Sequence, residues 1–400
     1  MSTVRLHLCG ITTDGELWHT SRSRNFLDPG GAWGPWSAWE SVKPQGVADA
    51  GPFVSAACGA RYVEDNEEIH ICAVTQDGRL LYTSRVAPQD WQPFEDLKTS
   101  IQGNWDSFRV QEVTFGLSFL DLCVIVLTNS GERHILHTSL GAGGTWESFQ
   151  DVNDPHAAGF PGSFISVGCA NLSPELPLEE LHVCGVTSDG KLWHTLYPFL
   201  VASFSWLPFA DVQKLTGSNA TPSHFTKVSI AQGSPDLQGR QDLHVFTQVD
   251  GDIWHTTRFS NPPPPRWQPT FGSIKKQAGD PGTFGSISCA NVDGQLHVCA
   301  VSADGKLWHT NTASDSASWQ SFEEVVAAGD TPPGGAFSFV SLAVIFVSPE
   351  RAGENPVCQI INWNMQNARS HMQGVSPGLA TELQQALLSL QQQWHDNGCI

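Results

Sequence analysis

The chain has 400 residues, among them 15 Trp, 37 Gly and 25 Pro, and only 15% of its residues are charged. This composition favours many short strands separated by turns over long helices. The formal net charge of −19, with no basic cluster, argues against binding to nucleic acid, whose phosphates require clustered Lys and Arg.

The N-terminal residues enter a strand-like pattern at once, without a basic and apolar leader. The longest apolar runs, such as 122–127, are too short to cross a bilayer as a helix. We therefore expect a soluble protein without membrane insertion. Its expected location is the cytoplasm, or the exterior of the cell after export that needs no signal peptide.

One segment recurs six times along the chain. Each copy is an apolar run that leads through a glycine turn into a second apolar run. The turn glycines are separated by 63, 53, 59, 61 and 54 residues, and a period of this size is typical of propellers and solenoids. The copies are LHLCGITTDGELWHT from Leu6, IHICAVTQDGRLLYT from Ile69, LCVIVLTNSGERHILHT from Leu122, LHVCGVTSDGKLWHT from Leu181, LHVFTQVDGDIWHT from Leu243 and LHVCAVSADGKLWHT from Leu296.

Each copy predicts a four-stranded antiparallel sheet. Asp-Gly between alternating strands indicates a tight hairpin, because the primed turns need positive φ. A closed ring lets each sheet cover its neighbours, so we predict an all-β propeller of four-stranded blades rather than a linear solenoid. In the last clear copy the expected strands are 285–290, 296–301, 306–310 and 319–325, and the other outer strands are 36–42, 91–97, 146–152, 206–212 and 267–274.

The number of blades is open between six and seven. An inner strand at 336–343 could close a six-bladed ring against the N-terminal strand. The segment 348–375 repeats parts of the pattern, however, so we prefer a degenerate seventh blade there. Leu spacing predicts a helix in 376–400, packed on the propeller. The predicted domains are thus six repeats in 1–347, the seventh blade in 348–375 and the helix in 376–400.

The DGxLWH hairpin, followed by an outer strand of the WxxFxDV kind, resembles the bacterial and fungal lectin propellers, including tectonin-type proteins. The resemblance covers residues 4–345. It implies several sugar pockets in the clefts between blades, and a role in recognition or defence. The Arg–Glu–Trp set by which one branch of these lectins holds fucose is not repeated here at fixed positions.

The Trp-His-Thr triplets of the third strands supply the candidate ligand-binding residues. An indole face packs well against the C–H edges of a sugar and carries a hydrogen-bond donor. Trp and His of one triplet lie on opposite faces of a strand, however, and repeated positions usually serve packing between repeats, which is the interpretation we favour. The candidates are Trp18, His19, Tyr82, Trp193, His194, Trp254, His255, Trp308 and His309.

Histidines of the second strands, with cysteines nearby, suggest a metal site. If Cys289 lies opposite His297, a Cys/His/Cys cluster able to hold zinc results, but a consistent fourth ligand is missing. We therefore predict no metal and no cofactor. Diagonal neighbours across strands are ~7–8 Å apart, too far for disulfides, so the ten Cys are expected as reduced thiols.

No nucleophile–base pair, HExxH, P-loop or GxSxG motif is present, and the acidic pairs such as Glu67-Glu68 are expected to be solvated. We predict a non-enzymatic, lectin-like propeller with multiple weak sites for glycans or glycoconjugates between its blades. Two alternatives stay open: a scaffold that binds a protein partner, or a recognition module associated with a toxin or with defence. A propeller glycosidase or lyase is less favoured.

Overall fold

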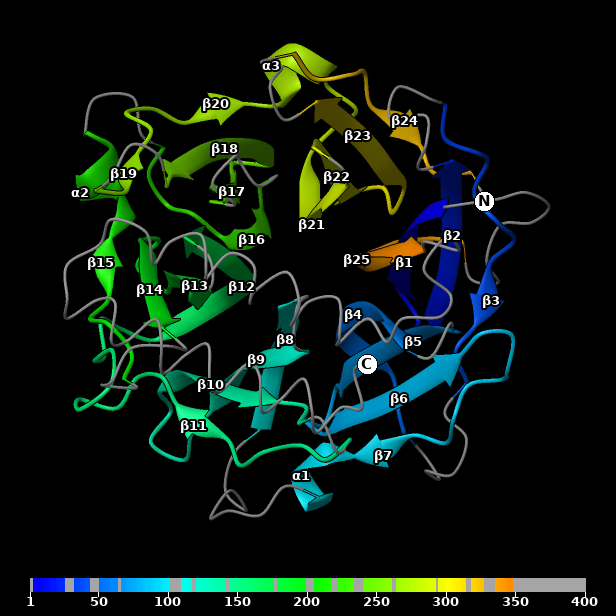
Figure 1. The fold of residues 1–400 in the computed structure, drawn as a ribbon, viewed down its shortest axis with the longest axis horizontal. Coiled ribbons are helices and arrows are strands. Elements are labelled where there is room, and N and C mark those ends of the chain that lie inside the picture. Colours follow the sequence, from blue (N-terminus) through cyan, green and yellow to red (C-terminus); the bar gives the residue numbers. More distant parts are fainter. Residues whose placement is uncertain are drawn as a thin grey trace, which may run out of the picture.

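The chain forms a ring of six antiparallel sheets around a central axis, as the computed structural model shows (Figure 1). The sheets are numbered here as blades 1 to 6 along the chain. The structure describes residues 3–25, 32–43, 50–63, 66–100, 109–116, 120–141, 144–175, 178–198, 205–217, 222–233, 240–260, 264–292, 294–313, 318–326 and 335–347.

From the axis outward, blade 1 contains β25 (Phe337–Val347), β1 (Thr3–Thr12), β2 (Leu17–Asn25) and β3 (Glu40–Ser41). Blade 2 contains β4 (Phe53–Val63), β5 (Asn66–Thr75), β6 (Leu80–Val86) and β7 (Glu95–Asp96). Blade 3 contains β8 (Arg109–Gly116), β9 (Asp121–Leu127), β10 (Arg133–Ser139) and β11 (Gln150–Asp151).

Blade 4 contains β12 (Phe164–Glu175), β13 (Leu178–Thr187), β14 (Leu192–Pro198) and β15 (Ala210–Asp211). Blade 5 contains β16 (Lys227–Gln232), β17 (Leu243–Val249) and β18 (Asp252–Phe259), whose outer edge pairs with both β19 (Arg266–Trp267) and β20 (Gly272–Ser273). Blade 6 contains β21 (Phe284–Val292), β22 (Gln295–Ser302), β23 (Leu307–Ala313) and β24 (Glu323–Glu324).

The ring closes with six blades. β25 pairs with β1 along its whole length, and its other neighbours are the inner strands β4 and β21. The last described strand therefore completes the first blade, and the preference for a seven-bladed ring is corrected to six. The predicted seventh blade at 348–375 and the predicted helix at 376–400 lie outside the described residues.

The outer strands are much shorter than the sequence predicts. Each is two residues long. In blade 2, for example, Trp91 lies before the outer strand and packs its ring against His19 of blade 1. Three single-turn helices follow outer strands: α1 (Leu97–Ser100), α2 (Val212–Thr216) and α3 (Lys275–Ala278). In the described part of the chain, no helix has the length and apolar character needed to cross a membrane.

The Asp-Gly hairpins have a different turn type from the one predicted. At the tip of blade 1 only Gly15 has a positive φ (84°), and its N–H donates to the Thr12 carbonyl at 2.9 Å. This is a type I turn followed by a left-handed glycine, a common three-residue hairpin loop. Only at the tip of blade 5 do the turn residues, Asp250 and Gly251, both have positive φ, as a primed turn requires.

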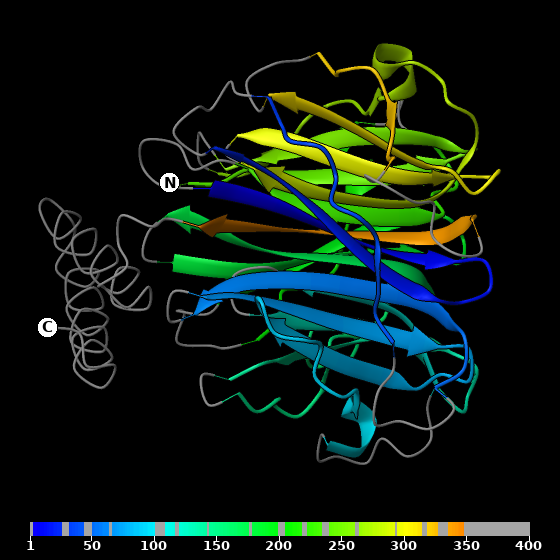
Figure 2. The same cartoon turned by 90° about the vertical axis from the view of Figure 1, so that its right-hand side faces the viewer.

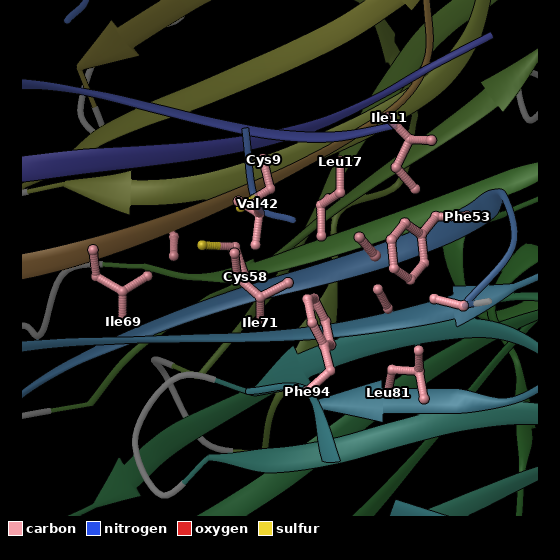
Figure 3. Close-up of a cluster of buried hydrophobic side chains, with 14 of the residues drawn as sticks. Cys9, Ile11, Leu17, Val42, Phe53, Cys58, Ile69, Ile71, Leu81 and Phe94 are labelled. Carbon is pink, nitrogen blue, oxygen red and sulfur yellow. The ribbon is translucent and has the colours of Figure 1, made fainter. Parts of the chain in front are cut away.

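The apolar core consists of six layers, one between each pair of neighbouring blades. Blade 1, with β1 and β2 in dark blue and β25 in orange, lies beside blade 2, drawn in lighter blue, in the side view (Figure 2). Burial of these faces is the main stabilising contribution, at roughly 25 cal/mol per Å² of apolar surface. In the layer between blades 1 and 2, Cys9, Ile11, Leu17 and Val42 face Phe53, Ile71 and Phe94 (Figure 3).

The inner strands form sheet edges, and their free N–H groups need acceptors. Side chains of the preceding blade supply them around the ring. The N–H of Val113 donates to Ser55 Oγ at 3.2 Å, and that of Val228 donates to Ser166 Oγ at 3.1 Å. In the same way Val340 donates to Ser286, Cys58 to Ser341, Cys289 to Ser229 and Val167 to Glu112.

Candidate functional site

Each blade holds, on one face between its second and third strands, a hydrogen-bonded pair of polar side chains that is here called the polar pair. In blade 1 the register places Cys9 opposite His19, so His7 and His19 are diagonal neighbours on one face of the sheet. The six pairs are His7–His19 (3.1 Å), His70–Tyr82 (2.7 Å), Asp121–His137 (2.8 Å), His182–His194 (2.9 Å), His244–His255 (3.0 Å) and His297–His309 (2.9 Å).

Sequence reasoning missed Asp121 and the pairing itself. Asp121 stands where the other blades have a second-strand His, one residue before the segment that aligned with the other copies. The available signal was the repeated spacing of 12 residues between the two His of blades 1, 4 and 6. That spacing spans one tight hairpin, so the two rings had to meet across it.

A tryptophan of the next blade covers each polar pair. Its ring meets the third-strand His or Tyr edge-on, at interplanar angles from 73° to 83°. Such edge-to-face contacts are favourable beyond the area they bury. The contacts are His19–Trp91 (5.7 Å), Tyr82–Trp146 (5.5 Å), His137–Trp206 (5.6 Å), His194–Trp267 (5.4 Å), His255–Trp319 (6.1 Å) and His309–Trp36 (6.2 Å).

Four third-strand Trp lie on the opposite face from the polar pair, as the alternation of side chains predicts. Trp308 packs in the layer between blades 5 and 6, whereas His309 faces blade 1. The indole N–H of Trp308 donates to Ser302 of its own hairpin at 3.0 Å. The packing interpretation describes these contacts; a binding role for the nine candidates stays a prediction.

Nine histidines of the pairs have a lowered pKa and are therefore neutral near pH 7. Burial lowers the pKa of His19 and of His244 to about 4. Burial also holds the pKa of His194 and of His309 well below the usual value, and the positive charge of a neighbouring group acts in the same direction. Each neutral imidazole is one donor and one acceptor, so one ring of a His–His pair donates and the other accepts.

The junction between blades 1 and 2 is electrically balanced. Glu40 accepts from His19 at 2.7 Å and pairs with Arg85 at 2.5 Å, and the Arg85 guanidinium lies 4.5 Å from the Trp91 ring centre. Burial alone would raise the pKa of Glu40, but the hydrogen bond from His19 and the charge of Arg85 lower it to about 2. Glu67 is likewise buried against Arg5 and His7, so the expectation that it is solvated was wrong.

The junction between blades 6 and 1 has the opposite character. Arg22 and Arg24 of β2 both lie over the ring of Trp33, at 5.0 and 5.2 Å from its centre. Nη2 of Arg22 also lies 3.0 Å from Nε2 and 3.3 Å from Nδ1 of His309, one of which accepts its hydrogen bond. This region therefore concentrates positive charge in a strongly acidic protein.

The register excludes the Cys/His/Cys arrangement that the sequence suggested for zinc, a site that we did not predict. His297 pairs with Ala290, and Cys289 pairs with Val298, one residue away from the assumed register. A shift of one residue moves a side chain to the other face of a sheet. Cys289 consequently lies between blades 5 and 6, whereas Cys299 lies between blades 6 and 1. No group of ligands suited to a metal is found among the described residues, and their eight Cys are free thiols.

The axis holds a cavity of about 40 Å³ lined by all six inner strands. It is far smaller than the roughly 300 Å³ or more of a small-molecule pocket. Its lining includes Cys58, Thr114, Ser229 and Ser341 but no Asp or Glu. A pair of carboxylates for glycoside hydrolysis is therefore absent from the described lining of the axis.

The fold has known counterparts among solved structures. The chain is similar to a mutant of Aleuria aurantia lectin in complex with Fucα1-6GlcNAc, with 14% identity, a TM-score of 0.52 and coverage of 83% of this chain and 97% of that one. The chain has the fold of the lectin propellers. A mutant of AofleA from Arthrobotrys oligospora is also similar, with 13% identity, a TM-score of 0.51 and coverage of 85% and 86%. No family model and no curated protein matches the sequence.

Proposed function

We propose that this protein is a non-enzymatic carbohydrate-binding propeller whose weak sites lie at the junctions between neighbouring blades. The lectin-propeller fold supports this function, and one of the similar lectins is in complex with a fucosylated sugar. Several weak sites on one ring would give avidity for a surface that displays many copies of a glycan.

Unpaired donors at the junctions carry the proposal. The indole Nε1 atoms of Trp91, Trp146 and Trp206 are buried and have no hydrogen-bond partner in the structure. Buried polar groups are normally hydrogen-bonded, so each of these N–H groups can donate to a ligand from outside the chain. A sugar hydroxyl can accept from the N–H while the sugar ring covers apolar surface beside it, and the polar pair supplies further groups nearby.

The proposal is tested with a glycan array and calorimetry on the full chain. A triple variant, Trp91→Phe, Trp146→Phe and Trp206→Phe, keeps the rings and removes the donors. We expect each altered site to bind its glycan about 2- to 10-fold more weakly, the value of one hydrogen bond. Trp39→Phe is the matched control. The Trp39 ring packs on that of Phe337, with 4.9 Å between the ring centres, and Trp39 is not one of the six tryptophans that cover a polar pair.

Two outcomes would contradict the proposal. One is a wild-type protein that binds no glycan on the array and agglutinates no cells. The other is a triple variant that binds its glycan with the affinity and stoichiometry of the wild type. A weakened triple variant together with an unchanged Trp39→Phe control would place binding at the junctions.

A further inference from the structure

The junction between blades 6 and 1 contains a buried cation, Arg22, that pairs with no carboxylate among the described residues. Arg22 is only 9% exposed, and its guanidinium lies 4.7 Å from the ring centre of Trp36 and 5.0 Å from that of Trp33. Among the described residues no carboxylate forms an ion pair with Arg22, and its Nε is buried without a hydrogen-bond partner. Contacts with aromatic faces compensate only part of the cost of burying a cation.

The equivalent arginine of blade 2 shows what is missing. Arg85 occupies the same register as Arg22, and it pairs with Glu40 of the preceding blade at 2.5 Å. The counterpart of Glu40 in blade 6 is Glu323, which is exposed and makes no hydrogen bond with His309 or Arg22 in the structure. It acts on Arg22 only through its more distant charge.

A second carboxylate is also replaced at this junction. Two residues before the second-strand His, blades 2 and 4 have Glu68 and Glu180, which contact His70 and His182 at 3.3 and 3.0 Å. Blade 6 has the neutral Gln295 at that position. Of the two carboxylates that could balance Arg22, Glu323 does not pair with it, and the other is replaced by Gln295.

Arg22 also contacts the polar pair of blade 6. A guanidinium can only donate, and Nη2 of Arg22 lies 3.0 Å from Nε2 and 3.3 Å from Nδ1 of His309. Nδ1 of His297 lies 2.9 Å from Nε2 of His309, and one of these two nitrogens donates to the other. Nε2 of His297 is buried and has no hydrogen-bond partner among the described residues.

The unpaired polar groups at this junction indicate the chemical class of ligand that it can bind. The Arg22 Nε–H and the Trp33 indole N–H, which also lacks a partner among the described residues, can both donate to a carboxylate, while Nε2 of His297 can form a hydrogen bond with a hydroxyl, a group that both donates and accepts. Trp33 is half-buried and its neighbour Pro35 is exposed, so the group lies near the surface. We propose that the junction between blades 6 and 1 binds a sugar that carries a carboxylate, with Arg22 as its charged partner. This proposal rests on the carbohydrate-binding function proposed above.

The test is calorimetry of the full chain with matched sugars: methyl glucuronide and the methyl glycoside of N-acetylneuraminic acid as acids, and methyl glucoside as the neutral probe. We expect an acidic probe to bind more tightly than the glucoside. Arg22→Gln should weaken binding of the acid about 10- to 100-fold, as expected for a hydrogen bond to a charged group. Lys191→Gln removes the same charge at an exposed site and should leave the affinity for the acidic sugar unchanged.

A second variant keeps the test independent of the stability of Arg22→Gln. Gln295→Glu restores a carboxylate where blades 2 and 4 have one, and it should reduce binding of the acid at least tenfold without loss of the fold. Acid binding that neither variant changes, or neutral sugars that bind as tightly as the acids, would overturn this inference and leave the proposed function standing. Absence of binding to any glycan would overturn both.

Discussion

Acidification from pH 7 to pH 5 is expected to remove most of the stability of this propeller. Burial lowers the pKa of nine histidines, all of them in polar pairs: His7, His19, His70, His182, His194, His244, His255, His297 and His309. In the unfolded chain these groups bind a proton near pH 6.5. In the folded protein burial lowers the pKa of each of these groups, so each stays neutral to a lower pH than in the unfolded chain.

The direction of the effect follows from the number of bound protons. Between pH 6.5 and the folded pKa, the unfolded chain binds more protons than the folded one, so the free energy of unfolding falls as the pH falls. For His19 and His244, whose folded pKa is about 4, the loss at pH 5 is about 2 kcal/mol each. The pKa of seven further histidines is also lowered, so each adds to the loss. The free energy of unfolding of a typical domain is only about 5–15 kcal/mol in total.

Urea unfolding at several pH values, followed by tryptophan fluorescence, measures this loss. The pH dependence of the free energy gives the number of protons taken up on unfolding, and His244→Gln should reduce that number by about one. His134 provides the control, because the hydrogen bond to Asp151 raises its pKa. His134→Gln should therefore not reduce the number of protons taken up on unfolding. A urea midpoint that is the same at pH 7 and pH 5 would contradict the prediction.

The carboxylates respond at lower pH. The pKa of Glu68 is about 2, because the hydrogen bonds and charges of His70 and Arg61 outweigh the effect of its burial. The contribution of Glu68 to the free energy of unfolding is complete above pH 4.5 and is lost as the pH falls toward 2. Loss of stability between pH 6.5 and 4.5 therefore reports on the histidines.

The architecture was predictable because it depends on local signals. Each copy carries two apolar runs around a glycine turn, and alternation alone placed Trp308 and His309 on opposite faces. The blade number was not predictable in the same way. It depends on the pairing of β25 with β1, two strands more than 300 residues apart, and no local pattern encodes that contact.

The candidate site was only partly predictable, because it is built across hairpins and across blades. An error of one residue in the register of Cys289 reversed its face and suggested a metal cluster. The charge balance was hidden for a similar reason: Glu67 of blade 2 neutralises Arg5 of blade 1, across a junction that has no signature in sequence. Arg22 became significant only when the structure showed which carboxylates fail to reach it.

Replacement of Glu112 is expected to destabilise the ring more than any other single loss of a carboxylate described here. Glu112 lies at a bulge of β8 in blade 3 and is only 9% exposed. It accepts from Ser166 Oγ at 2.8 Å, from the Val167 N–H at 3.0 Å and from Lys227 Nζ at 2.5 Å. One carboxylate thus joins the inner strands of blades 3, 4 and 5.

Glu112→Ala should lower the free energy of unfolding by about 3 kcal/mol, because it leaves two donors without an acceptor and Lys227 without its counter-ion. Ser166 also accepts from the Val228 N–H at 3.1 Å, so the loss extends to the next junction. Glu112→Gln keeps an acceptor for Ser166 and should cost less. Glu132→Ala, at a side chain of the same blade that is 54% exposed, is the control and should change stability by less than about 0.5 kcal/mol. If urea unfolding at pH 7 gives Glu112→Ala the same midpoint as this control, the carboxylate does not hold the three blades together.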